Sequence, residues 1–141
     1  MDEEIIFIVG VVMKVIIAGS RGITDYHILK EAWGQFKYRD EVSEIVCGEA
    51  PGIDTLGRRL GEELDIYIAS FPAQWDTPRG FDRGAGRKRN AKMGEYADAL
   101  LAVWDFESVG TKHMIDFANN LGLYVEIYNT NGVRVIQNRY W

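Results

Sequence analysis

The chain has 141 residues, 47% of them hydrophobic and 26% charged, a composition that excludes a disordered chain and suits one globular domain with a single core. The formal net charge is −5, so the surface as a whole repels nucleic acids and anionic membranes. The single cysteine, Cys47, excludes an internal disulfide and a two-cysteine zinc site, and the two histidines are scattered. We therefore expect a cytoplasmic protein without a metal site.

Residues 1–12 form an N-terminal extension before the single domain that we expect over residues 13–141. Its apolar part, residues 5–12, is too short for a membrane-spanning helix, and Lys14 interrupts its continuation. The extension begins with acidic residues, whereas a signal peptide begins with basic ones. Two interpretations remain open: an extra strand, or residues that precede a natural start at Met13.

Runs of apolar and β-branched residues predict six strands. Met13–Ala18 is a continuous run of this kind, the pattern of a strand that is buried on both faces of a sheet. The other predicted strands are Glu44–Cys47, Ile66–Phe71, Ala99–Trp104, Tyr124–Tyr128 and Val133–Gln137. Asn131-Gly132 predicts a hairpin turn before the last of them.

Helical periodicity occupies the gaps between the strands. Asp25 and Asp54 are the predicted N-caps of two helices, and two more are predicted over Lys88 to Tyr96 and from Gly110 onward. The stretch from Thr77 to Gly86 is polar and glycine-rich without periodicity, so we expect a loop there.

This alternation predicts an α/β fold, a Rossmann-like, doubly wound, mostly parallel sheet with helices on both faces and a C-terminal β-hairpin. Met13–Ala18 should be its central strand, between Glu44–Cys47 and Ala99–Trp104. Ligands of such sheets bind outside the carboxyl ends of the strands, so the loops that follow the strands carry the candidate site.

The loop after the first strand contains Gly19, Ser20 and Arg21. Glycine lets backbone N–H groups approach an anion closely, and the following helix N-terminus adds partial positive charge. Ser20 offers a hydroxyl group and Arg21 a guanidinium. The loop has neither the Walker pattern nor the dinucleotide GxGxxG pattern, and a plain strand–helix turn is the alternative.

The loop after the second strand, with Gly48 and Gly52, repeats this design at the neighbouring strand end. Asp54 either caps the helix that follows or contacts a ligand.

A basic run follows the third strand. It comprises Arg79, Arg83, Arg87, Lys88, Arg89 and Lys92, opposed only by Asp82. In an acidic protein this run is a candidate phosphate-binding segment, and its glycines suggest a flexible lid. The alternative is a solvated, charged loop.

The loop after the fourth strand brings Ser108, Gly110 and Thr111 to a helix N-terminus, where hydroxyl and N–H groups can bind a phosphate. Trp75 and Trp104 both follow strand ends, where an aromatic ring can stack on a base or belong to the core.

Together these segments resemble the YspA-like branch of the SLOG superfamily, which is named after the SMF/DprA and LOG proteins. The similarity covers about residues 13–128 and rests on Met13 to Arg21, Gly48 to Asp54, Phe71 to Trp75, Arg89 to Met93 and Trp104 to Thr111. It implies a Rossmann-like fold that binds nucleotides or nucleotide-derived ligands. The ligand-binding residues that it implies are Gly19, Ser20, Arg21, Gly48, Gly52, Asp54, Arg89, Asn90, Ser108, Gly110 and Thr111.

Some positions depart from the family pattern. Cys47, Glu49 and Pro51 replace a serine, a glycine and an arginine of the second loop, and Arg87 replaces a proline before Arg-Asn. Met114 occupies the position of the glutamate that acts on the sugar–base bond in LOG enzymes, and a thioether is no acid or base. Asp105, Glu107 or Asp54 would have to act instead.

The sequence therefore favours binding, for sensing or sequestering, of a phosphate-bearing nucleotide ligand, with ADP-ribose- or NAD-like molecules among the candidates. One alternative is an N-glycosidic hydrolase of nucleotides or ADP-ribose-type substrates. The other is DprA-like nucleic-acid binding, which the negative net charge disfavours. We expect Ser20, Gly48, Arg89 and Thr111 to line one cleft. The resemblance and the aromatic C-terminus, Tyr140-Trp141, also lead us to expect a homo-oligomer.

Overall fold

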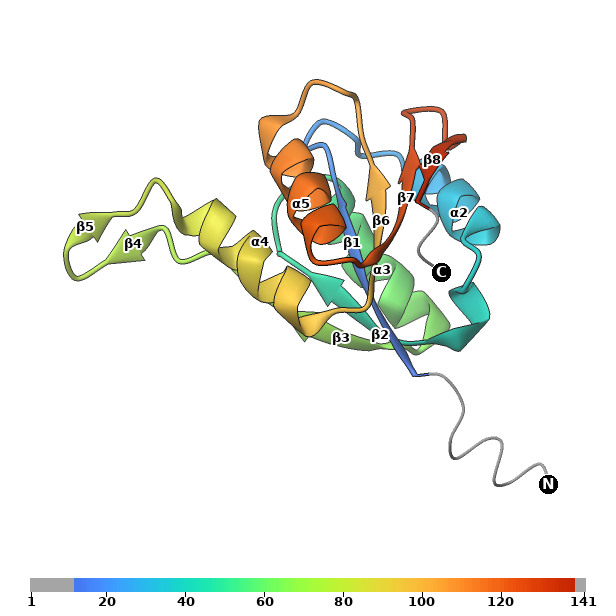
Figure 1. Ribbon diagram of the computed structural model, residues 1–141, viewed down its shortest axis with the longest axis horizontal. Helices are drawn as coiled ribbons and strands as arrows, with labels where there is room; N and C mark the ends of the chain where they lie inside the picture. Colours follow the sequence, from blue (N-terminus) through green and yellow to red (C-terminus); the bar gives the residue numbers. More distant parts are fainter. Residues whose placement is uncertain (1–11, 139–141) are drawn as a thin grey trace.

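A six-stranded sheet runs through the computed structural model, which describes residues 12–138 (Figure 1). Its order is β3-β2-β1-β6-β7-β8. Strand β1 (Met13–Gly19) pairs in parallel with β2 (Val42–Cys47) on one side and with β6 (Ala99–Val103) on the other. The predicted central strand and both of its predicted neighbours are thereby confirmed.

The remaining strands extend the sheet on both sides. Strand β3 (Tyr67–Ser70) pairs in parallel with β2, and β7 (Tyr124–Tyr128) pairs in parallel with β6. Strand β8 (Arg134–Gln137) pairs antiparallel with β7, so the predicted C-terminal hairpin is confirmed. The Asn129 Oδ1 accepts hydrogen bonds from the N–H groups of residues 131 and 133 within the turn between β7 and β8.

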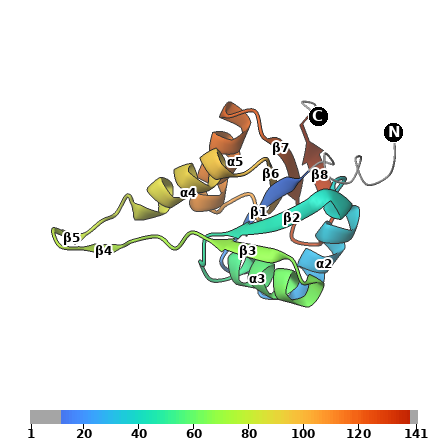
Figure 2. The same ribbon diagram turned by 90° about the horizontal axis from the view of Figure 1, so that it is seen from below.

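Helices cover both faces of the sheet (Figure 2). Helices α2 (Tyr26–Gln35) and α3 (Ile53–Leu64) cover one face, and α4 (Ala85–Tyr96) and α5 (Val109–Asn120) cover the other. A short 3-10 helix, residues 39–41, leads into β2. Along β1, Val15 and Ile17 join the first core while Ile16 and Ala18 join the second, which explains the unbroken apolar run. No helix within residues 12–138 has the length and apolarity that crossing a membrane requires.

The two predicted helix caps have different outcomes. The Asp25 carboxylate accepts from the His27 N–H at 3.0 Å, as an N-cap does. The prediction for Asp54 is wrong, because Gly52 is the N-cap of α3 and Asp54 lies in its first turn. Gly52 has a φ of 85°, a conformation that glycine adopts without strain, so the helix begins two residues earlier than predicted.

The segment Thr77 to Gly86, which was predicted to be a loop, contains regular secondary structure. Strands β4 (Asp76–Thr77) and β5 (Gly80–Phe81) form an antiparallel hairpin, and α4 already begins at Ala85. The hairpin projects from the rest of the molecule in both views (Figures 1 and 2). Two-residue strands are too short to produce an alternating pattern of apolar and polar residues, so no periodicity marks this hairpin in the sequence.

The interpretations of the N-terminal extension and of the aromatic C-terminus concern residues 1–11 and 139–141, which lie outside the described residues.

Candidate functional site

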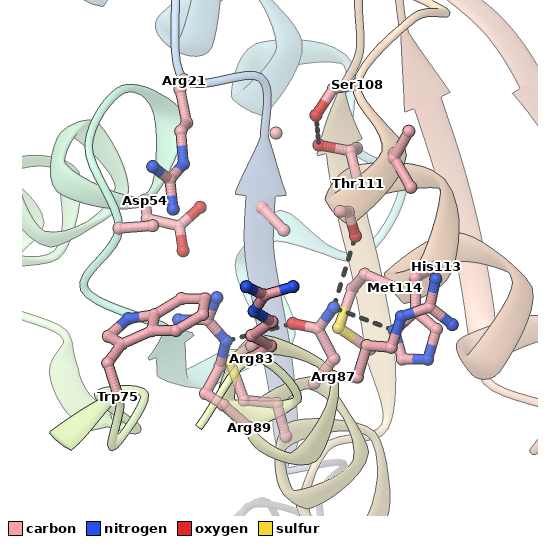
Figure 3. Close-up of a pocket in the computed structure, with 18 residues that line it drawn as sticks. Arg21, Asp54, Trp75, Arg83, Arg87, Arg89, Ser108, Thr111, His113 and Met114 are labelled. Carbon is pink, nitrogen blue, oxygen red and sulfur yellow. Dashed lines mark hydrogen bonds between the residues drawn. The ribbon is translucent and has the colours of Figure 1, made fainter. Parts of the chain in front are cut away.

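A pocket of ≈ 200 Å³ opens at the carboxyl ends of β1 and β6 (Figure 3). Strand β1 lies between β2 and β6, so the chain leaves β1 towards one side of the sheet and later returns on the other. This change of direction is the place where open α/β sheets bind ligands. The pocket walls come from the end of β1, the N-termini of α3 and α5, and one side of α4.

Most of the predicted ligand-binding residues meet at this pocket. Its lining includes Gly19, Arg21, Asp54, Arg89, Asn90, Ser108, Gly110 and Thr111. Ser20, Gly48 and Gly52 are absent from the lining. Of the four residues expected to share one cleft, Arg89 and Thr111 line this pocket, and Ser20 and Gly48 do not.

Ser20 ties two loops of the site together. It is buried, its N–H donates to the Val103 carbonyl at 3.1 Å, and its Oγ accepts from the Asp105 N–H at 3.0 Å. These bonds hold the loop after β1 against the loop after β6. Ser20 therefore positions the backbone on both sides of the pocket.

The two glycines of the second loop, Gly48 and Gly52, lie where a side chain would collide with neighbouring segments. A Cβ on Gly48 would lie 2.8 Å from the Arg89 Cζ and 2.8 Å from the Asp54 Oδ2. A Cβ on Gly52 would lie 2.6 Å from the Arg21 carbonyl oxygen. Both residues thus allow the close packing of segments that carry the pocket's charged groups.

The basic run divides into two sets. Arg83, Arg87 and Arg89 line the pocket, where Arg21 joins them from the first loop. Arg79, Lys88 and Lys92 are not among the lining residues, and Lys88 forms an ion pair with Asp82 at 2.7 Å. Within α4, the helical repeat explains why Arg89 lines the pocket and Lys88 and Lys92 do not, because residues 86, 89, 90 and 93 share its pocket side. Arg83 and Arg87 belong to the basic run that was predicted as a candidate phosphate-binding segment, but they are not among the ligand-binding residues that the resemblance implies.

The N-terminus of α5 forms the wall opposite α3. Ser108 is the N-cap residue, and the Thr111 Oγ1 donates to its Oγ at 3.2 Å. The first N–H groups of a helix have no partner within the helix and carry partial positive charge. A Cβ on Gly110 would meet nothing within 4 Å, so the helix start is open to an approaching anion.

Asn90 connects α4 to α5 beneath this wall. It is buried, its Oδ1 accepts from the Arg89 Nε at 3.1 Å, and its Nδ2 donates to the Gly110 carbonyl at 3.3 Å. The same Nδ2 lies 3.1 Å from the His113 Nδ1. Burial, and then the charge of Arg87, lower the pKa of His113, while Asp116 opposes them. The surroundings of His113 thus disfavour its protonated form.

Asp54 is the only carboxylate that lines the pocket among the described residues. It is 6% exposed, and its carboxylate faces the cavity (Figure 3). Burial raises its pKa to about 6, against the opposing charge of Arg89 and hydrogen bonding to the backbone of Ala50 and Gly19. The folded protein therefore holds this carboxylate at an energetic cost.

The two tryptophans proposed for base stacking differ in position. Trp75 lines the pocket and stacks on Phe81 of the hairpin, with centroids 5.8 Å apart and planes 12° apart. Trp104 is not a lining residue. Its Nε1 donates to the Ser108 carbonyl at 3.0 Å, and its ring packs on Phe106 with a centroid distance of 4.5 Å.

The candidate catalytic acids Asp105 and Glu107 also lie away from the lining residues. The Asp105 Oδ1 accepts from the N–H groups of Glu107 and Ser108 at 2.9 Å and 2.8 Å, so this carboxylate stabilises the turn before α5. Met114 is 1% exposed and belongs to the core, and it contributes to the pocket floor.

Comparison with protein-family models, with curated proteins and with solved structures finds no match to this chain. Within the described residues, no three His, Cys, Asp or Glu side chains are grouped so that they could hold a metal ion.

Asp54→Asn should stabilise the protein at neutral pH. Because the folded state raises the pKa of this acid from 3.8 to about 6, the folded state binds a proton that the unfolded state releases, and wild-type stability falls as pH rises through this range. We expect the variant to gain about 1–3 kcal/mol in the free energy of unfolding at about pH 7.5 and much less at about pH 4. Urea unfolding of the variant, the wild type and the exposed control Asp116→Asn measures this difference. A variant less stable than wild type at about pH 7.5 would show that the charge is structurally required.

Proposed function

We propose that the protein binds a phosphate-bearing nucleotide or nucleotide-derived ligand in this pocket and thereby senses or sequesters it. One observation carries the proposal: the N-terminus of α5 and four arginines converge on a single pocket of a protein whose formal net charge is −5. Phosphate is the ligand group that such an arrangement favours, because helix N–H groups and guanidinium groups both donate to its oxygens.

The chemistry of the walls suggests how such a ligand is oriented. Ser108, Gly110 and Thr111 offer hydroxyl and N–H donors for a phosphate, and Arg87 and Arg89 line the same pocket from α4. Trp75 presents an aromatic ring at another side of the pocket (Figure 3). A base stacked there and a phosphate at α5 would place a sugar between them.

The resemblance to the YspA-like branch of the SLOG superfamily supports the same ligand class. Its motifs contribute Gly19, Arg21, Asp54, Arg89 and Asn90 to the pocket lining. ADP-ribose- and NAD-like molecules remain in this class, because they combine a base, sugars and phosphates. Nucleic-acid binding has less support, since the arginines of α4 face a small pocket and the surface as a whole is acidic.

The proposal is tested by the titration of His113. Its imidazole lines the pocket beside α5 and has a lowered pKa, so a bound phosphate should stabilise the protonated form and raise this pKa. His27, the other histidine, is exposed on α2 and serves as an internal control. We expect NMR titration with pyrophosphate, AMP or ADP to raise the pKa of His113 and to leave His27 unchanged. Equal shifts at both histidines, or at neither, would contradict a phosphate site at this pocket.

Arg87→Met should weaken phosphate binding with little effect on folding, because Arg87 lines the pocket and is exposed near the start of α4. The substitution removes one charged donor, whose contact with an anion contributes about 1.5–3 kcal/mol, and keeps an unbranched apolar stem. Arg79→Met is the matched control, because Arg79 lies on the exposed hairpin and does not line the pocket. Calorimetry with ADP should therefore show weaker binding for the first variant only. A large fall in the melting temperature of Arg87→Met would identify Arg87 as structural instead.

Efficient LOG-type hydrolysis is not expected. Met114 is apolar and Asp105 and Glu107 do not line the pocket, so within residues 12–138 neither α5 nor the loop before it contributes a carboxylate to the pocket lining. Loss of an acid or base typically lowers the rate by about 10²–10⁴-fold. Incubation with AMP, ADP-ribose and NAD, followed by chromatography, should show no rapid release of free base. Rapid release would support the hydrolase alternative and would make Asp54, the pocket carboxylate, the first residue to replace.

A further inference from the structure

Asp54 presents a carboxylate where the proposed ligand is anionic. It lies on the first turn of α3 and is the sole acidic group lining the pocket within residues 12–138. Arg21 and Arg89 lie on either side of it in the close-up (Figure 3). Among the described residues, no lysine or arginine nitrogen lies within 4.0 Å of the Asp54 carboxylate oxygens, so Asp54 forms no ion pair with them.

The pocket is therefore divided by charge. The α5 wall offers unpaired helix N–H groups and hydroxyl groups, which favour phosphate. The α3 wall offers a carboxylate, which repels phosphate and accepts hydrogen bonds. A ligand with a phosphate at α5 must therefore present hydrogen-bond donors, and no negative charge, to Asp54.

The neighbours of Asp54 limit the kind of donor. A ligand ammonium group would lie close to Arg21 and Arg89 and would be repelled by them. An aromatic base is better placed at Trp75, which lines another side of the pocket. A neutral hydroxyl group satisfies both conditions, and a sugar lies between the phosphate and the base of every nucleotide.

We propose that Asp54 accepts hydrogen bonds from sugar hydroxyl groups of the bound ligand, so that the site selects ribonucleotide-type ligands over those lacking the 2′- and 3′-hydroxyls. This inference rests on the proposed function, since it orients the ligand by its phosphate. Hydroxyl groups bound to a buried carboxylate form charge-assisted hydrogen bonds, which are stronger than neutral ones. The carboxylate already accepts hydrogen bonds from the backbone of Ala50 and Gly19, and a ligand without these hydroxyls would leave its remaining acceptor capacity towards the pocket unused.

The test compares AMP and ADP with their 2′,3′-dideoxy counterparts by calorimetry, using wild type, Asp54→Asn and the control Asp116→Asn. Asp116 is exposed on α5 and does not line the pocket, and both substitutions remove one negative charge. We expect wild type and the control to prefer the ribonucleotides by about 10- to 100-fold. Asp54→Asn should lose most of this preference while its affinity for the dideoxynucleotides stays equal or rises, because one repelling charge is gone. Circular dichroism confirms that each variant is folded.

The outcomes separate this inference from the proposed function. Equal wild-type affinity for the two kinds of nucleotide overturns the role of Asp54 and leaves phosphate binding intact. A preference that survives in Asp54→Asn also overturns it. Absence of binding of both kinds, together with an unchanged His113 titration in pyrophosphate, overturns the nucleotide proposal and this inference with it. Parallel loss of both affinities in Asp54→Asn would mean that Asp54 only positions Arg89.

Discussion

The Arg89 guanidinium donates to the Gly48 carbonyl, and this contact joins the end of β2 to the first half of α4. Its Nε donates to Asn90, which in turn holds α5 through the Gly110 carbonyl. One side chain and its neighbour thus connect three elements that are far apart in the sequence. The connection requires that residue 48 has no side chain, because the space beside it is occupied by Arg89 and Asp54. The pocket exists because these three elements are held at this spacing.

The same arrangement explains the electrostatic state of the pocket. Burial lowers the pKa of Arg89 and raises that of Asp54, while each charge partly offsets the cost of the other. Within the described residues, Asp54 and Arg89 do not form a direct ion pair with each other. Groups held in unfavourable environments of this kind are characteristic of binding sites, where a ligand supplies the missing interactions.

Sequence reasoning predicted the fold well because the fold depends on patterns with a clear period. The continuous run of β1 reflects two cores, one on each face, and each strand-end loop follows such a run. Sequence reasoning failed where a strand was too short to show a period and where a boundary depended on the backbone conformation of one residue. The hairpin of β4 and β5 has two-residue strands, and the start of α3 depends on the positive φ of Gly52.

The site shows the same limit at the level of single residues. The motifs predicted which segments meet at the pocket. They did not predict which side chains of these segments face into it. Ser20 and Trp104 make hydrogen bonds that stabilise the loops. Arg83 and Arg87 line the pocket, and the basic pattern predicts a phosphate-binding segment without indicating which of its residues face inward. Glu126 shows the same limit outside the site, because its burial does not follow from the sequence pattern. Tyr124 and Tyr128 donate to its carboxylate from the same face of β7. The Lys37 N–H, from a turn distant in the sequence, donates to it at 3.0 Å.

The position of the hairpin adds a further constraint on the ligand. Trp75 precedes β4, and its stacking on Phe81 links the pocket wall to the projecting arm. Phe81 is 65% exposed, so the arm contributes little apolar burial to the body of the protein. The Asp82 N–H donates to the Trp75 carbonyl at 2.6 Å, and the Asp82 carboxylate accepts from the Gly84 N–H at 2.9 Å just before α4. The ring of Trp75 is thus fixed by its own hairpin and by the start of α4, the helix that also carries Arg87 and Arg89. A base stacked on Trp75 and a phosphate between α4 and α5 would therefore both be positioned by α4, leaving the sugar facing α3 and Asp54.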